Sequence, residues 1–164
     1  MFETTSKTVP LNELAGRVEK LRANGKKIVA TNGCFDLLHL GHIRYLEAAR
    51  KLGDILVVGL NGDQSVRELK GPGRPINNEK DRAAILAALE SVDLVVIFPE
   101  LRATRFIERA APDVYVKGGD YSCETLDAEE RAALQKIGSK IEIVPFEKSY
   151  STSALLEKLR GNKK

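Results

Sequence analysis

The chain carries five short runs of apolar, mostly β-branched residues, separated by longer and more polar stretches. Continuous apolar runs of this length are typical of strands that are buried on both faces of a parallel sheet. Glycine, asparagine and aspartate stand at the ends of several runs and mark turns. The sequence therefore predicts about five buried strands, at residues 27–31, 55–59, 94–98, 114–116 and 141–144.

The segments between these runs carry apolar residues at helical spacing. This alternation predicts an α/β fold, a single-domain, Rossmann-like, doubly wound parallel sheet with helices on both faces. We expect residues 1–25 to form an N-terminal arm and helix, residues 26–160 the α/β core and residues 161–164 a frayed tail. The helical positions are Leu11, Leu14, Val18 and Leu21, then Ile43, Leu46 and Ala49, then Ile85, Leu86 and Leu89, and finally Leu155, Leu156 and Leu159.

Composition excludes several classes of protein. The N-terminus lacks the apolar segment of a secretion signal, and no apolar run approaches the length that spans a bilayer. Two cysteines make neither a disulfide framework nor a metal cluster. The 164 residues suffice for one well-packed domain. We therefore expect a cytoplasmic protein without a membrane partner.

The charge distribution argues against nucleic acid as a partner. The formal net charge is +3, yet cationic and acidic residues are interleaved along most of the chain. Only residues 158–164 form a basic cluster, and no aromatic residue accompanies it. Proteins that bind nucleic acid present larger basic surfaces. A modest positive charge instead suits a pocket that holds phosphates.

Both histidines of the chain lie in one segment, G-C-F-D-L-L-H-L-G-H, at residues 33–42, where the first predicted strand gives way to a helix. His39 and His42 bracket the expected helix start, where unpaired N–H groups and a partial positive charge favour phosphate binding. Gly41 leaves room for a phosphate to approach the backbone. Ordinary cap or surface histidines are the alternative. The flanking strand and the G-x-F-D residues favour a nucleoside triphosphate site.

Other polar clusters follow the remaining strands. Ligands bind at the carboxyl ends of parallel strands, near the point where the strand order reverses. Asn61 and Asp63 follow the second predicted strand, residues 117–121 the fourth and residues 149–153 the fifth. We expect these groups to share one crevice with the histidines.

Residues 69–77 hold two glycines and two prolines and are predicted to form a loop. Such a loop can close over a triphosphate, to which Lys70 and Arg74 bring cationic groups. Arg82, on the next predicted helix, is placed to reach the same phosphates. A surface loop with solvated charges is the alternative.

Two later segments offer further contacts. Gly118 and Gly119, after Lys117, let the backbone lie against a flat ligand, while Asp120 accepts hydrogen bonds and Tyr121 offers a stacking face. A plain β-turn is the alternative. The hydroxyl-rich start of the last helix fits both capping and phosphate binding, through Tyr150, Ser151, Thr152 and Ser153.

Aspartates are the candidate metal ligands, although each also suits a turn or a cap. Asp36, Asp63 and Asp93 have no spacing that forms a dedicated metal site. Magnesium in such a pocket is more often carried by phosphates. We therefore expect Mg²⁺ to arrive with the triphosphate.

The histidine segment resembles the H-x-G-H nucleotidyltransferase superfamily. Four segments together, residues 31–39, 69–77, 116–121 and 150–153, resemble one branch of it, the heptose 1-phosphate adenylyltransferases of ADP-heptose synthesis. In that branch the adenylyltransferase is either fused to a sugar kinase or stands alone, and the length of 164 residues leads us to expect the stand-alone form. The resemblance implies an enzyme, often a homodimer, that joins ATP to a sugar 1-phosphate by in-line attack on the α-phosphorus. The implied acceptor is D-glycero-β-D-manno-heptose 1-phosphate, and the products are ADP-heptose and pyrophosphate.

The acceptor phosphate needs no general base, because the second pKa of a phosphate monoester is about 6. Catalysis then consists of positioning and charge neutralisation. We expect three sets of site residues. The catalytic set is His39, His42, Lys70 and Arg82, and the sugar-phosphate set is Asp36, Arg74 and Tyr121. The nucleotide set is Asn32, Gly33, Cys34, Phe35, Asp36, Gly41, Asn61, Asp63, Lys117, Gly118, Gly119, Asp120, Tyr150, Ser151, Thr152 and Ser153.

Three alternatives stay open. A cytidylyltransferase that acts on glycerol 3-phosphate or another small phosphorylated alcohol uses the same motif. A fragment related to aminoacyl-tRNA synthetases shares the H-x-G-H pattern, but the chain is too short to read an anticodon and lacks the lysine-rich synthetase loop. A non-catalytic module binds ATP without releasing pyrophosphate. The chain departs from the heptose branch at Gly62, at Ser153 and over residues 122–133.

Overall fold

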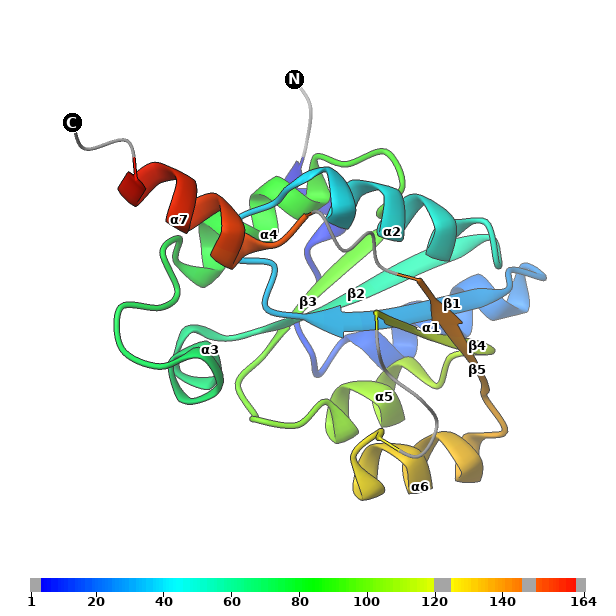
Figure 1. Cartoon of the computed structure of the whole chain (residues 1–164). Helices are drawn as coiled ribbons and strands as arrows, with labels where there is room; N and C mark the ends of the chain where they lie inside the picture. The colour runs from blue at the N-terminus through cyan, green and yellow to red at the C-terminus, as the bar shows by residue number, and fades with distance from the viewer. Residues whose placement is uncertain (1–3, 120–124, 146–149, 162–164) are drawn as a thin grey trace.

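The computed structural model describes residues 4–119, 125–145 and 150–161. Its centre is one parallel sheet with the strand order β3-β2-β1-β4-β5 (Figure 1). This sheet confirms the predicted five-stranded, doubly wound α/β fold. The strands are β1 (Ile28–Gly33), β2 (Ile55–Asn61), β3 (Leu94–Phe98), β4 (Val114–Gly118) and β5 (Lys140–Val144).

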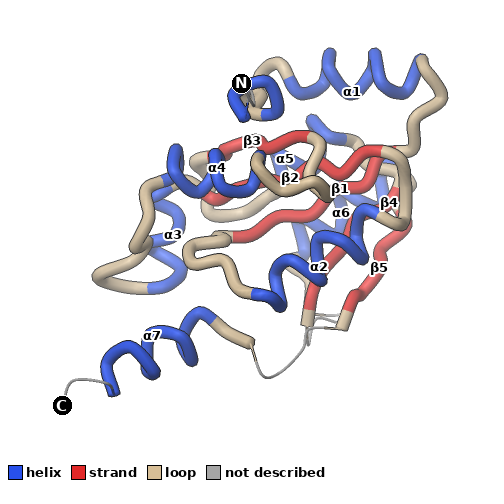
Figure 2. The backbone as a smooth tube through the Cα atoms, turned by 90° about the horizontal axis from the view of Figure 1, so that it is seen from above, coloured by secondary structure: helices blue, strands red, loops and turns tan. Residues whose placement is uncertain are grey.

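Helices cover both faces of the sheet. In Figure 1, α2 and α4 lie above it and α5 and α6 below it, and α1 packs on the lower side. Figure 2 shows α7 as a separate rod outside these layers. The helices are α1 (Leu14–Ala23), α2 (Leu40–Arg50), α3 (Asp63–Lys70), α4 (Glu79–Ala87), α5 (Thr104–Ala110), α6 (Ala128–Ile137) and α7 (Thr152–Gly161), with a 3₁₀ turn, η1, at Thr4–Lys7.

The core consists of two apolar clusters, one on each face of the sheet. Successive side chains of a strand point to opposite faces, so Ile28 and Ala30 pack toward α1, α5 and α6, whereas Val29 packs toward α2 and α4. All three are fully buried. Burial on both faces explains why the strands appear in the sequence as continuous apolar runs.

Two elements differ from the expectation. Helix α3 was not predicted, because only Ser65 and Val66 of its residues are buried and no apolar stripe marks it. Lys70 is the last residue of this helix, so the loop begins at Gly71 rather than at residue 69. The N-terminal arm joins the sheet edge, where the N–H of Val9 donates to the carbonyl of Val95 at 2.9 Å.

The strand order reverses between β1 and β4, and the sheet opens there. Main-chain pairing of β1 with β4 covers Val29 and Ala30, whereas pairing of β1 with β2 continues to Gly33. The hydroxyl of Tyr45, from α2, spans the gap by contacting Thr31 Oγ1 at 2.6 Å and the carbonyl of Val116 at 3.1 Å. Ligands of open α/β sheets bind at such a point.

No helix in the described ranges is both long and apolar enough to cross a bilayer.

Candidate active site

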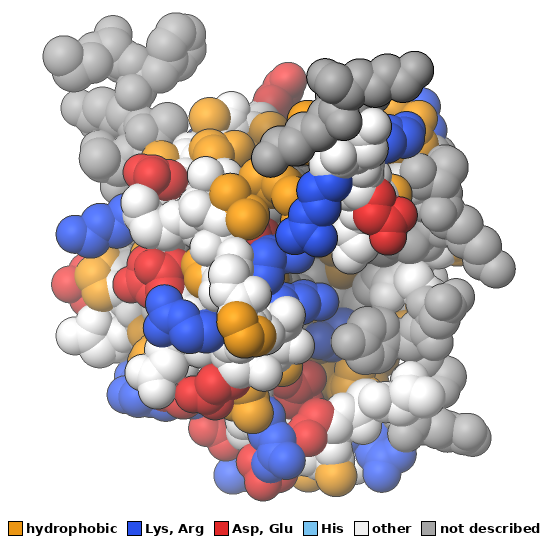
Figure 3. Space-filling view, turned by 60° about the vertical axis from the view of Figure 1, so that its left-hand side comes forward, with side chains coloured by type: hydrophobic (Ala, Val, Ile, Leu, Met, Phe, Trp, Pro, Cys, Tyr) orange, Lys and Arg blue, Asp and Glu red, His pale blue; other side chains and the backbone are white. Residues whose placement is uncertain are grey.

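A cavity of about 810 Å³ opens at the carboxyl ends of the strands. Figure 3 presents the face on which they emerge, and lysine and arginine side chains gather along its middle. The cavity collects most of the predicted site residues, namely Asn32, Gly33, Cys34, Phe35, Asp36, His39, His42, Asn61, Lys70, Arg74, Lys117, Gly118, Tyr150, Ser151, Thr152 and Ser153.

Four predicted residues that the structure describes do not line this cavity: Gly41, Asp63, Arg82 and Gly119. Asp120 and Tyr121 lie outside the described residues.

The two histidines stand together at the start of α2. His39 is the N-cap residue, with extended backbone, and its ring stacks on that of His42 with centroids 3.8 Å apart. The backbone N–H of His39 donates to Nδ1 of His42 at 3.4 Å. Because Nδ1 accepts, a neutral His42 carries its proton on Nε2, which is then a hydrogen-bond donor.

Burial keeps both rings neutral. Desolvation, followed by the neighbouring His39, lowers the pKa of His42 to about 4, and desolvation also lowers the pKa of His39. Two stacked imidazolium rings would repel each other in this partly buried position. Near neutral pH, His42 is therefore a neutral hydrogen-bond donor.

Phe35 and Gly33 shape the floor beside His42. Phe35 adopts a φ of 41°, uncommon for a residue with a side chain, and its ring lies 5.4 Å from that of His42. A Cβ on Gly33 would stand 2.9 Å from Cε2 of Phe35. Glycine at position 33 therefore allows the Phe35 ring to fold back against the histidine.

Helix α7 reaches the site from the far end of the chain. Thr152 Oγ1 donates to the carbonyl of Leu37 at 3.2 Å, and Ser151 Oγ accepts from the N–H of Ala154 as an N-cap. A Cβ on Gly41 would meet His39 Nδ1 at 3.0 Å and Cβ of Tyr150 at 3.1 Å. Gly41 thus makes room for neighbouring side chains rather than directly for a phosphate.

Asp36 anchors the loop that follows α3. Its carboxylate accepts from Arg74 Nε at 2.7 Å and from the N–H groups of Ile76 and Asn77 at 2.9 and 3.0 Å. Burial opposes ionisation of Asp36, but these N–H groups and Arg74 outweigh it and hold its pKa below the ordinary value. Asp36, which was predicted to contact the nucleotide and the sugar phosphate, therefore shapes the loop, and Arg74 balances its charge.

Arg82 is a correction to the predicted catalytic set. Its side chain is fully buried, and its guanidinium donates to four groups in three segments of the chain. Fixed in this way on the inner side of α4, it holds the walls of the site together and does not reach into the cavity. The acceptors are the carbonyls of Asn77 (2.9 Å), Cys34 (2.7 Å) and Asn61 (2.9 Å) and the carboxylate of Asp63 (2.7 Å).

The same bonds account for two other predicted residues. Asp63 pairs with Arg82 instead of lining the cavity. Cys34 contributes its carbonyl, and burial raises the pKa of its thiol above the ordinary value, so the thiol is protonated near neutral pH.

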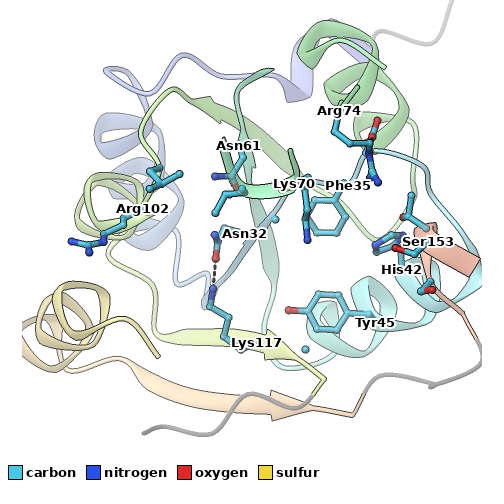
Figure 4. A pocket seen from close by; sticks show the side chains of 18 of the residues that line it. Asn32, Phe35, His42, Tyr45, Asn61, Lys70, Arg74, Arg102, Lys117 and Ser153 are labelled. Carbon is cyan, nitrogen blue, oxygen red and sulfur yellow. Dashed lines mark hydrogen bonds and ion pairs between the residues drawn. The ribbon is translucent and has the colours of Figure 1, made fainter. Parts of the chain in front are cut away.

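A buried polar network spans the gap between β1 and β4. Lys117 Nζ donates to Asn32 Oδ1 at 2.9 Å (Figure 4). The same Lys117 Nζ lies 3.7 Å from Glu130 Oε2. The hydroxyl of Tyr115 donates to the same Asn32 oxygen. Desolvation lowers the pKa of Lys117, although Glu130 counteracts it.

Several lining residues were missed by the sequence analysis. Tyr45, Arg102, Asp127 and Glu130 all line the cavity. Tyr45 belongs to the apolar stripe of α2, and Asp127 with Glu130 has the spacing of a capped helix start, so neither pattern indicates a binding role. Arg102 follows β3 and carries no motif.

Within the described ranges, the side chains do not form a dedicated metal site. The described residues contain no group of three or more His, Cys, Asp or Glu side chains that could hold a metal ion. Asp36, the carboxylate of the histidine segment, is already held by Arg74 and two N–H groups.

The family model described as cytidylyltransferase-like matches residues 30–159. Bifunctional protein HldE from Citrifermentans bemidjiense is 49% identical over 157 residues, and HldE from Koribacter versatilis is 51% identical over 154 residues. These alignments cover 96% and 93% of this chain but 32% and 31% of the relatives. The chain thus spans about a third of the length of the curated relatives that it matches.

Solved structures share the fold. A lipopolysaccharide core biosynthesis protein from Thermoplasma volcanium has a TM-score of 0.63 and 34% identity, over 77% of this chain and 100% of that one. Pantoate-beta-alanine ligase from Francisella tularensis, at 14% identity and a TM-score of 0.58, covers 93% of this chain and 76% of its own, and shows likeness of fold alone. With a family match over most of its length and a solved relative that it covers completely, the chain belongs to the cytidylyltransferase-like family.

Proposed function

We propose that this protein transfers the adenylyl group of ATP to D-glycero-β-D-manno-heptose 1-phosphate and releases pyrophosphate. The observation that carries the reaction class is the stacked pair of His39 and His42 at the start of α2, in a cavity shared with Lys70 and the start of α7. The HldE relatives and the Thermoplasma volcanium protein support ADP-heptose synthesis as the setting.

The adenylyl group passes directly from ATP to the acceptor, without a covalent enzyme intermediate. An ionised oxygen of the acceptor phosphate attacks the α-phosphorus and forms a new P–O bond. The bond from the α-phosphorus to the oxygen that bridges to the β-phosphate breaks, and its electron pair leaves with pyrophosphate. The acceptor oxygen is already deprotonated near neutral pH, because the second pKa of a phosphate monoester is about 6.

The protein's part is to hold the phosphates and stabilise the charge that develops. Nε2–H of His42 donates to a phosphate oxygen in a partly buried position, where a hydrogen bond is stronger than in water. Lys70 supplies positive charge, and the N–H groups at the start of α7 face the β- and γ-phosphates. Bound to the ATP phosphates, Mg²⁺ would add charge neutralisation.

A pyrophosphate-release screen tests the proposal. Each of ATP and CTP is combined with heptose 1-phosphate or with glycerol 3-phosphate, in the presence of Mg²⁺. We expect release with ATP and heptose 1-phosphate, and its near loss in His42→Ala, which lacks the Nε2 donor. Absence of release from the wild type in that combination refutes the proposal, as does near-normal turnover of a folded His42→Ala variant.

The cytidylyltransferase-like family description favours one second candidate, cytidylyl transfer to glycerol 3-phosphate or another small phosphorylated alcohol. Release with CTP and glycerol 3-phosphate alone supports it. ATP binding without release in any combination indicates a non-catalytic module instead.

The proposal also includes a homodimer, as the family resemblance implies, and a location in the cytoplasm, as the composition leads us to expect. Light scattering of the purified protein tests the dimer, and fractionation of cells tests the location. A monomeric mass contradicts the first part, and recovery with membranes contradicts the second.

A further inference from the structure

The cavity has two ends of different chemistry. In Figure 4, His42 and Ser153 lie at one side and Arg102 at the other, with Asn32 and Lys117 between them. At the histidine end the lining carboxylate is Asp36, whose charge Arg74 balances at 2.7 Å. A triphosphate is therefore accommodated at the histidine end without an uncompensated negative charge beside it.

The opposite end combines carboxylates with cations. Asp127 and Glu130, from the start of α6, line it together with Arg102, from the segment after β3. Arg102 Nε lies 3.0 Å from Asp127 Oδ2. Glu130 is 6% exposed, and its Oε1 accepts from the N–H of Ala103 at 2.8 Å. This contact ties α6 to the segment that carries Arg102.

Such a mixture suits a hydroxylated ligand better than a polyphosphate. A carboxylate accepts hydrogen bonds from hydroxyl groups, while guanidinium and ammonium groups donate to their oxygens. Asp127 is paired with Arg102, and Glu130 Oε2 lies 3.7 Å from Lys117 Nζ, so this end presents hydrogen-bond donors and acceptors side by side rather than a purely cationic surface. Lys117, between the two ends, can meet the single phosphate of a sugar 1-phosphate.

We propose that Arg102, Asp127 and Glu130 form the subsite that recognises the hydroxyl groups of the acceptor sugar. The sugar lies against α6, and its phosphate extends past Lys117 toward His42. Asp36 and Arg74, predicted to contact the sugar phosphate, line the histidine end of the same cavity. The inference rests on the proposed function.

The structure offers two variants that preserve the fold and one matched control. The Arg102 side chain is 52% exposed, so Arg102→Ala removes its contacts without opening the core. Asp127 caps α6 by accepting from the N–H groups of Glu129 and Glu130, and Asp127→Asn keeps this cap while removing the charge. Arg105 is 55% exposed, pairs with Glu100 and does not line the cavity, so Arg105→Ala is the control.

The experiment measures initial rates of pyrophosphate release while ATP and heptose 1-phosphate are varied separately. We expect Arg102→Ala and Asp127→Asn each to raise KM for heptose 1-phosphate at least about tenfold, the effect of losing roughly one charged hydrogen bond. KM for ATP should stay within about twofold of the wild type. Arg105→Ala should leave both constants unchanged.

The outcomes separate the two proposals. A wild type that releases no pyrophosphate with ATP and heptose 1-phosphate refutes the proposed function, and the subsite with it. An active wild type whose two variants keep a normal KM for heptose 1-phosphate overturns the subsite alone. An equal rise of KM for ATP also overturns it, because that result places the nucleotide at this end.

Discussion

Replacing Arg82 by lysine tests whether this residue holds the site together or contacts a phosphate. Lysine keeps the positive charge but concentrates its three donors on one nitrogen, whereas the arginine fork bonds in several directions. A lysine at position 82 cannot reach all four of the acceptors that the guanidinium serves.

The magnitude follows from the groups that lose their donor. Arg82 has no exposed surface, so water does not replace it. Each buried carbonyl left without a partner costs about 1–3 kcal/mol. With one or two of the carbonyls of Cys34, Asn61 and Asn77 unsatisfied, the free energy of unfolding should fall by about 3 kcal/mol.

Urea unfolding without nucleotide, followed by circular dichroism near neutral pH, measures this loss. Arg67→Lys, on the exposed side of α3, is the control and should stay within about 0.5 kcal/mol of the wild type. An Arg82→Lys variant of wild-type stability that binds ATP more weakly would refute the reasoning. It would restore Arg82 to the phosphate-binding residues.

Three further predictions concern the histidines, the glycines and Lys70. Because folding lowers the pKa of His42 from 6.5 to about 4, its neutral form contributes stability above pH 6.5 that is lost as the pH falls toward 4. Between about pH 7.5 and about pH 4.5, wild type should lose about 2 kcal/mol more than His42→Gln in urea unfolding, and an equal loss contradicts the burial argument. Gly33→Ala should lower kcat/KM roughly 100-fold, because the added Cβ displaces the Phe35 ring. The control Gly16→Ala, on the exposed face of α1, should add about 0.5–1 kcal/mol to the free energy of unfolding and leave turnover unchanged. Normal kinetics of Gly33→Ala would show that the Phe35 ring can move without cost. Lys70→Ala should raise KM for ATP about tenfold, while Lys80→Ala, exposed and outside the cavity, should not; an unchanged KM in both removes Lys70 from the site.

Much of the fold was predictable because its signals are local. The apolar runs predict the strands, since a strand covered on both faces needs apolar side chains at every position. The β3 segment occupies residues 94–98 in the structure, as predicted, whereas β1 extends to Gly33, two residues beyond its predicted end. The extra residues are more polar because they enter the cavity, where the apolar pattern ends.

Helix α3 shows where local signals fail. Its residues are mostly charged or polar, so the sequence shows no apolar residues at helical spacing there. The position of α3 is set by contacts with other segments. One such contact is that of Glu79 Oε2, which accepts from the N–H of Asp63 at 2.8 Å.

By itself, the sequence determined the α/β alternation, the strand-to-helix junction with both histidines and the family to which these residues point. Each of these depends on neighbours along the chain. Only the tertiary structure decided what individual polar side chains do. Arg82 is buried and links separate parts of the site, because its acceptors lie up to 48 positions away along the chain. Asp36 holds the loop after α3, because the N–H groups of Ile76 and Asn77 donate to its carboxylate. Arg102 and Glu130 entered the cavity because the sheet places the ends of β3 and β4 beside the start of α6.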